Sequence, residues 1–204
     1  NARVLAAAER NNGLLCVGLD PDLSRFPAAL QARFAQDPAG ALIAFNQAII
    51  EATSDLVCAY KPNLGFYMSY GLPGLEALLR TCELIPSEIP VILDAKVNDV
   101  GHTATAYAAG YFDQFNVDAV TLSPYLGADS LVPFLARPGR GVLILCRTSN
   151  PSAGDLQDLP VVWGETGTGG SPLYEVMAHK IAAWIEQFDA AGAIGAVTGA
   201  TYPA

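Results

Sequence analysis

Short, nearly continuous apolar runs alternate along this chain with longer amphipathic segments, and this alternation constrains the fold more than any other feature. The apolar runs predict strands at residues 14–19, 57–60, 90–93, 119–122, 142–146 and 194–197. The amphipathic segments predict helices at residues 41–53, 75–85, 103–115, 128–135 and 172–188, the last with Ser171 as N-cap and Pro172 at its first position. Strands that are apolar throughout and alternate with amphipathic helices are typical of a parallel sheet covered by helices, so we expect an α/β fold, either an open sheet or a closed barrel.

The residues that end the predicted strands favour a closed barrel over an open sheet. Polar or turn residues stand at or just after five strand ends: Asp20, Lys61, Asp94, Pro124 and Arg147. In a (β/α)8 TIM barrel these ends meet on the face where active sites are built. About six of the eight β/α units of such a barrel are present, and a six-stranded parallel sheet would leave two edges open. We therefore expect residues 1–204 to form a single barrel domain that is incomplete at its C-terminus.

Composition and charge narrow the class of protein. Hydrophobic residues make up 51% and charged residues 15% of the chain, which argues against disorder. No apolar run reaches the roughly 18 residues that a membrane-spanning helix needs. A net charge of −9 disfavours nucleic acid and acidic lipid as partners, although local lysines could still attract a small anion.

The cysteines and the N-terminal segment favour a cytoplasmic protein. Cys16, Cys58, Cys82 and Cys146 are far apart and form no C-x-x-C pair, so we expect buried free thiols in a reducing compartment. The first twelve residues have no signal-peptide organisation, because their apolar stretch is short and interrupted by charges.

Three ionisable side chains follow the predicted strand 90–93 within six residues: Asp94, Lys96 and Asp99. A strand continuing through them would place Asp94 and Lys96 on one face, and Asp99 would lie on the turn into the next helix. Burying such charges is costly unless they pair with one another. Spacing alone leaves two interpretations open, an ion pair that closes the barrel mouth and a charge network whose lysine delivers a proton to carbon.

Lys61 and Asp20 strengthen the catalytic interpretation. Lys61 ends the preceding strand, so we expect it beside Asp94, and Asp20 ends the first strand. Acidic and basic residues that alternate around one rim lower the cost of burying each other.

Four motifs follow one another along the chain: Cys16-Val17-Gly18-Leu19-Asp20-Pro21, Lys61-Pro62-Asn63, the D-x-K-x-x-D pattern at Asp94, Lys96 and Asp99, and Arg147-Thr148-Ser149-Asn150-Pro151. Taken together and in this order, they resemble the orotidine 5′-phosphate decarboxylase family in its bacterial branch. The D-x-K-x-x-D pattern alone is shared with related sugar-phosphate lyases, but the flanking motifs make the set more specific. The resemblance implies decarboxylation of orotidine 5′-phosphate to uridine 5′-phosphate in pyrimidine biosynthesis, with no cofactor and no metal.

The resemblance also implies roles for individual residues. Lys96 would protonate C6 of the pyrimidine, Asp94 would lie against the departing carboxylate, and Lys61 would bridge Asp94 and the ribose. The remaining roles are a ribose contact for Asp20, a pyrimidine contact for Ser149, and contacts across a homodimer interface into a shared active site for Asp99, Val100 and Thr103.

The sequence departs from the family pattern in places. Such enzymes often carry Arg-Gly at the positions of Val97 and Asn98 and Ser at that of His102, which puts local packing in doubt. The Gly-rich loop and the arginine that grip the 5′-phosphate in the family are not found in this sequence. Residues 164–171 resemble a phosphate cradle but lack the lysine of a P-loop, so a mobile loop is favoured, and closure over substrate is one role that such a loop could have.

Three other functions remain open. A related sugar-phosphate lyase would use Mg²⁺, but such relatives generally carry an acidic residue at the position of Lys61. A Schiff-base aldolase would use Lys61 or Lys96 as the nucleophile. A non-catalytic fragment or binding module is the third. The two histidines, His102 and His179, are too far apart to suggest a metal pair.

Overall fold

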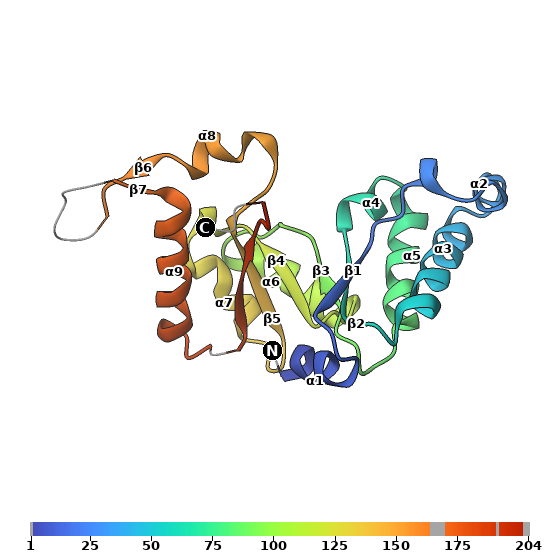
Figure 1. The fold of residues 1–204 in the computed structure, drawn as a ribbon, viewed down its shortest axis with the longest axis horizontal. Coiled ribbons are helices and arrows are strands. Elements are labelled where there is room, and N and C mark those ends of the chain that lie inside the picture. The colour runs from blue at the N-terminus through green and yellow to red at the C-terminus, as the bar shows by residue number, and fades with distance from the viewer. Residues whose placement is uncertain (1, 164–169, 191, 202–204) are drawn as a thin grey trace. The chain divides into compact units, whose positions relative to one another are not determined.

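The computed structural model describes residues 2–163, 170–190 and 192–201, which form two compact units. The first unit comprises Asn1–Ala95 and Ala106–Val120, and the second comprises Lys96–Thr105 and Thr121–Ala204. The helices and strands of both are labelled in Figure 1.

Parallel pairing organises the strands of the first unit. Its strands are β1 (Leu15–Leu19), β2 (Val57–Pro62), β3 (Ile92–Leu93) and the start of β4 (Ala119–Leu122). β1 pairs with β2, and Leu19 lies opposite Pro62. β3 pairs with β4, and Leu93 lies opposite Val120. Single bridges from Tyr60 to Val91 and from Asn63 to Asp94 connect the β2 and β3 segments, so each successive strand lies parallel to the one before it.

The helices of the first unit bury a polar cluster as well as an apolar core. They are α1 (Ala2–Arg10), α2 (Ala28–Phe34), α3 (Pro38–Thr53), α4 (Leu64–Met68), α5 (Gly71–Leu84) and the end of α6 (Gly101–Ala109), followed by a π-helical turn at Gly110–Gln114. α3 packs against both α2 and α5, as Figure 1 shows. Between α3 and α5, the buried Asn46 Nδ2 donates to Tyr67 Oη at 3.0 Å and to Thr81 Oγ1 at 2.9 Å.

The second unit is built on the parallel pair β5 (Gly141–Arg147) and β8 (Ile194–Thr198). α9 (Leu173–Gln187) packs against both strands, and α7 (Val132–Leu135) packs against β5 (Figure 1). An antiparallel pair, β6 (Pro160–Val161) with β7 (Ser171–Pro172), and the one-turn helix α8 (Gly154–Gln157) connect β5 to α9. Three 3₁₀ turns, at Pro124–Leu126, Ala128–Leu131 and Pro151–Ala153, occupy the remaining connections.

The predicted strands and helices are present in the predicted order, but the prediction omitted α1, α2, α4, α8, β6 and β7, and one predicted cap is wrong. Ser171 does not cap α9, because it lies in β7 opposite Val161. Pro172 precedes the helix with extended backbone (ψ 145°), so it is not the first helical residue either, and it provides no side-chain cap. Residues 164–169 of the predicted substrate loop lie outside the described part of the chain, and a single domain over residues 1–204 stays a prediction.

The cysteine prediction is confirmed in part. All four thiols are free, and Cys58 and Cys146 are buried in their strands. Cys16 was expected to be buried but is exposed, because β1 is only partly covered along its length. Cys82 lies half-buried on α5.

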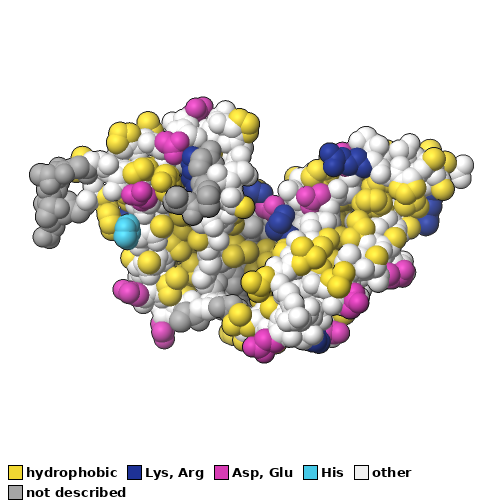
Figure 2. Space-filling model, viewed as in Figure 1, with side chains coloured by type: hydrophobic (Ala, Val, Ile, Leu, Met, Phe, Trp, Pro, Cys, Tyr) yellow, Lys and Arg dark blue, Asp and Glu magenta, His cyan; other side chains and the backbone are white. Residues whose placement is uncertain are grey.

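Hydrophobic and charged side chains are interspersed on the face drawn in Figure 2. The most exposed large hydrophobic side chains, between 70% and 85% exposed, are Leu14, Leu72, Tyr125 and Val162. Within the described ranges, no helix combines the length and the hydropathy needed to cross a bilayer.

Candidate active site

A buried carboxylate lies where the β2 and β3 segments of the first unit meet. Asp94 is 8% exposed, and its Oδ2 accepts from Lys61 Nζ at 3.0 Å and from Asn63 Nδ2 at 3.4 Å. Backbone pairing sets this geometry, since Asp94 N donates to Pro62 O at 2.9 Å and Leu64 N donates to Asp94 O at 3.1 Å. The predicted proximity of Lys61 and Asp94 is therefore confirmed.

Lys61 and Asp94 differ in their access to solvent. The Lys61 side chain is 34% exposed, whereas the Asp94 side chain is 9% exposed. A buried carboxylate held by a partly exposed ammonium group is a preorganised charge pair, and such a pair can act on a ligand without first reorganising water.

Asn63 is a site residue that was not predicted. Its Oδ1 accepts from Gly65 N at 3.0 Å and so caps α4, while its Nδ2 faces Asp94. Period two in the β2 segment could have indicated it, because Asn63 follows Lys61 by two residues.

Two tyrosines hold the backbone on either side of Asp20, which is exposed just after β1. Tyr67 Oη donates to Leu19 O and Tyr70 Oη donates to Pro21 O, both at 2.9 Å. Burial raises the pKa of Tyr67 well above its ordinary value, so this hydroxyl stays protonated and remains a donor. A Cβ added at Gly18 would lie 3.5 Å from Asp20 Oδ2, so the Asp20 carboxylate is near Gly18, which pairs with Lys61 in the β1–β2 ladder.

Lys96 belongs to the second unit and does not continue the β3 strand. β3 ends at Leu93, and Lys96 has a φ of 57°, in the left-handed region that non-glycine residues rarely adopt. The expectation that a strand places Asp94 and Lys96 on one face is therefore wrong. Lys96 N donates to both Thr121 O (2.9 Å) and Thr121 Oγ1 (3.0 Å), and these bonds to a buried threonine hold the unusual backbone conformation in place.

The segment after Lys96 is held by Asn98, which was not predicted as a site residue. Asn98 Nδ2 donates to Ser130 Oγ at 2.9 Å, and Asn98 Oδ1 accepts from Ser123 N at 3.1 Å. Asp99 Oδ1 accepts from the next backbone amide, that of Val100, at 2.7 Å. One side-chain amide thus ties the loop of Lys96 and Asp99 to two other loops of the same unit.

Two of the three dimer residues inferred from the resemblance are exposed, and the third, Asp99, is half-buried. Val100 is 45% exposed, and Thr103 is exposed on the first turns of α6. His102 lies between them and lines a shallow hollow with Asp129. His179, on α9, stacks on Trp163 with ring centroids 5.1 Å apart.

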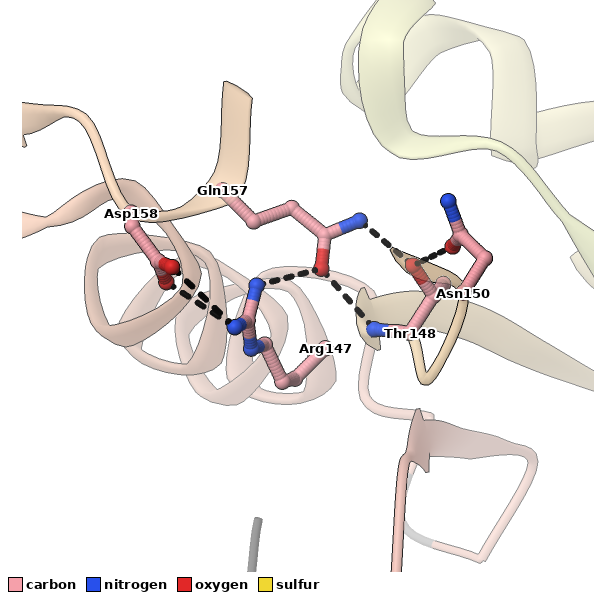
Figure 3. A network of polar contacts seen from close by, with 5 residues as sticks. All are labelled: Arg147, Thr148, Asn150, Gln157 and Asp158. Carbon is pink, nitrogen blue, oxygen red and sulfur yellow. Dashed lines mark hydrogen bonds and ion pairs between the residues drawn. The ribbon is translucent and has the colours of Figure 1, made fainter. Parts of the chain in front are cut away.

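Arg147 is the centre of a polar network in the second unit (Figure 3). It is 5% exposed, its Nη1 donates to Gln157 Oε1 at 3.2 Å, and its Nη2 pairs with Asp158 Oδ1 at 3.0 Å. Its guanidinium also lies 5.2 Å from the ring centroid of Tyr174. Ser149, two residues beyond Arg147, is exposed on the turn that follows β5.

The predicted site residues therefore fall into two groups. Asp20, Lys61 and Asp94 belong to the first unit, and Lys61 and Asp94 are in direct contact. The second unit contains the other predicted site residues, Lys96, Asp99, Val100, Thr103 and Ser149. The contact residues Asn98, Gln157 and Asp158 were missed because they lie in connections between strands, where no periodic pattern marks a polar residue that makes a tertiary contact.

Comparisons of this chain with known proteins agree on one family. Residues 13–203 match the family described as orotidine 5′-phosphate decarboxylase / HUMPS. A relative from Thermomicrobium roseum named orotidine 5′-phosphate decarboxylase is 52% identical over 194 residues, which cover 95% of this chain and 64% of the relative. A relative of the same name from Herpetosiphon aurantiacus is 52% identical over 199 residues, which cover 98% of this chain and 69% of the relative.

A solved structure agrees with these relatives. The structure of Leishmania donovani OMP decarboxylase superposes with a TM-score of 0.82 and 38% identity, covering 99% of this chain and 71% of that one. The chain thus spans about two thirds of the length of the curated relatives it matches. The chain belongs to the orotidine 5′-phosphate decarboxylase / HUMPS family and has the (β/α) barrel fold class that its strand order and motifs predicted.

Proposed function

We propose that the protein is an enzyme that decarboxylates orotidine 5′-phosphate to uridine 5′-phosphate in pyrimidine biosynthesis. The observation that carries this proposal is the buried Asp94 carboxylate paired at 3.0 Å with the partly exposed Lys61 ammonium. The names of the relatives, at 52% identity, support the same activity.

The reaction breaks the bond between C6 of the pyrimidine and its carboxylate. The electron pair of that bond stays on C6 as CO₂ departs, and Lys96 Nζ donates a proton to C6, leaving a neutral amine that regains a proton from solvent. The Asp94 carboxylate lies against the departing group, and the Lys61 charge stabilises the negative charge that develops. Lys96 suits the proton transfer because its backbone is fixed by two hydrogen bonds to Thr121 while its side chain is exposed.

The remaining residues bind the nucleotide. Asp20, whose backbone is held by Tyr67 and Tyr70, accepts a hydrogen bond from a ribose hydroxyl. Lys61 bridges Asp94 and the ribose, and the exposed Ser149 contacts the pyrimidine ring. These side chains act directly on the small-molecule substrate, so the proposed reaction uses no cofactor.

The active protein is proposed to be a cytoplasmic homodimer with shared active sites. Asp99, Val100 and Thr103 form a segment that would reach into the partner's site, and the exposure of Val100 and Thr103 is compatible with this role. The net charge of −9 makes nucleic acid and acidic membrane surfaces unsuitable partners.

A Mg²⁺-dependent sugar-phosphate lyase is the second candidate, because the family description includes the HUMPS branch. Lys61 disfavours it. Its ammonium group lies 3.0 Å from Asp94 and places a positive charge where a cation would need a carboxylate. Activity towards a sugar phosphate that disappears with a chelator would favour this candidate instead.

The absorbance change of orotidine 5′-phosphate mixed with the full-length gene product tests the proposal. Turnover is expected without added metal, and its absence would sink the proposed activity. Lys96→Ala should lower kcat at least about 10²-fold, the usual range for losing a general acid, and leave the unfolding midpoint unchanged. Undiminished turnover in this variant would refute the role of Lys96.

A further inference from the structure

Gln157 contacts the backbone and the side chain of the turn that carries Ser149. Gln157 Oε1 accepts from Thr148 N at 2.9 Å, and Gln157 Nε2 donates to Thr148 Oγ1 at 2.7 Å. Thr148 Oγ1 in turn donates to Asn150 Oδ1 at 2.7 Å (Figure 3). One half-buried amide is therefore bonded directly to Thr148, which precedes Ser149, and is linked through the Thr148 hydroxyl to Asn150, which follows it.

The donors and acceptors in this network leave Gln157 little freedom to rotate. Its oxygen also accepts from Arg147 Nη1 at 3.2 Å, so a flipped amide would present N–H groups to two donors. Because the Gln157 amide donates to the Thr148 hydroxyl, that hydroxyl directs its own proton towards Asn150. Arg147 is in turn held by Asp158, which follows Gln157 in sequence.

β8 supports the other side of the same turn. Gly199 N donates to Arg147 O at 2.8 Å, and a Cβ at position 199 would lie only 3.2 Å from Ser149 Cβ and 3.3 Å from Ser149 N. Glycine at this position thus lets the chain after β8 pack closely against Ser149. The turn is held between this contact and the Gln157 amide.

We propose that Gln157 is a positioning residue that holds the Thr148–Asn150 turn so that Ser149 presents its hydroxyl to the pyrimidine ring. This inference rests on the proposed function for the ring contact, whereas the effect of Gln157 on the turn is independent of it. Gln157 does not touch the substrate and acts through Thr148. A misplacement of about 1 Å in a group that positions substrate can cost on the order of 10²-fold in rate, so a remote amide can affect turnover.

Two substitutions separate the functions of the Gln157 amide. Gln157→Leu removes both its acceptor and its donor. Gln157→Glu keeps oxygen acceptors for Thr148 N and Arg147 but loses the donor to the Thr148 hydroxyl. Gln47→Leu is the matched control, since Gln47 is exposed on α3 and bonds only to the exposed Glu51 among the described contacts.

The first measurement is amide hydrogen exchange of Thr148 in the ligand-free, full-length gene product. Gln157→Leu should speed exchange at Thr148 at least about tenfold by removing the acceptor of its N–H. Gln157→Glu should keep exchange slow, as should Gln47→Leu. Unchanged exchange in Gln157→Leu would overturn the inference, whatever the activity of the enzyme.

The second measurement is a double-mutant cycle of kcat/KM with Ser149→Ala. We expect Gln157→Leu to lower kcat/KM about tenfold in the native background and less than about twofold in the Ser149→Ala background. Additive losses would mean that Gln157 does not act through Ser149, and they would overturn the inference. A native enzyme without turnover would refute the proposed function instead and leave the exchange result to decide the effect of Gln157 on the turn.

Discussion

Two buried charges, one in each unit, find their partners in different ways. Asp94 pairs with Lys61 and accepts a hydrogen bond from Asn63, which precede it by 33 and 31 residues on the neighbouring strand segment. Arg147 donates a hydrogen bond to Gln157 and pairs with Asp158, which follow it by 10 and 11 residues in the same connection. The partner of Asp94 comes from parallel strand pairing, and the partners of Arg147 come from a local return of the chain.

The difference indicates which charge is available for chemistry. Lys61 keeps about a third of its side chain exposed, so its charge can act on a ligand. The Arg147 side chain is 6% exposed, and its guanidinium is bonded on two nitrogens and lies over the ring of Tyr174. The difference in exposure supports the proposed use of the Asp94 pair in catalysis and of the Arg147 network in holding the turn that carries Ser149.

Turnover gives the largest expected contrast between the two regions. Asp94→Asn keeps the shape of the side chain but removes its charge, and we expect kcat/KM to fall by about 10³-fold, as for other losses of preorganised electrostatic stabilisation. Asp158→Asn should cost less than about tenfold, because Asp158 is half exposed and pairs with a residue that does not touch substrate. Equal losses in steady-state kinetics would erase the proposed division of roles.

Stability should show the opposite order. Arg147→Met removes a buried guanidinium with its hydrogen bonds to Gln157 and Asp158, and we expect a loss of about 2–3 kcal/mol in the free energy of unfolding. Asp94→Asn should cost less than about 1 kcal/mol, since it removes a buried charge, keeps an oxygen that can accept from Lys61, and leaves only the partly exposed Lys61 without its ion pair. Urea unfolding with matched slopes measures both values. A larger loss for Asp94→Asn would contradict the proposed division of roles.

The smallest expected effect concerns the alkylation rate of the Cys146 thiol, because Cys146 lies next to Arg147 in sequence. Burial raises the pKa of the Cys146 thiol, although the next residue is the positively charged Arg147. A raised pKa means less thiolate at a given pH, so Cys146 should alkylate more slowly than a free cysteine at pH 7.5 and accelerate as the pH rises. Burial also raises the pKa of Cys82, to about 12, which makes that thiol a slow-reacting internal reference. Faster-than-free alkylation of Cys146 would show that the Arg147 charge is available after all.

The parts of the site that follow from strand order could be predicted from the sequence. Lys61 and Asp94 end consecutive parallel strand segments, so their proximity follows once the strands are located. The backbone conformation at Lys96 could not be predicted in the same way. Periodicity does not show that β3 ends at Leu93 or that Lys96 adopts a left-handed backbone conformation. Ser171 was mistaken for a cap because its pairing with Val161 is a tertiary contact.

Asn63, Asn98 and Gln157 share a feature that sequence reasoning does not capture. Each uses both ends of one side-chain amide, and each amide connects two different backbone segments or side chains. Asn98 also stands where the family often carries glycine, and its two hydrogen bonds account for the packing of this departure from the family pattern.

By itself, the sequence determined the α/β class, the strand order and the charges at the strand ends, because hydrophobic periodicity and the residue that ends a strand are local properties of the chain. The tertiary structure decided the contacts that strand order does not imply. Asn63 reaches Asp94 through the bridge between the β2 and β3 segments, and Gln157 reaches Thr148 because the chain turns back after β5. A buried polar group takes the partner that the folded backbone brings within about 3 Å, and the path of that backbone does not follow from hydrophobic periodicity.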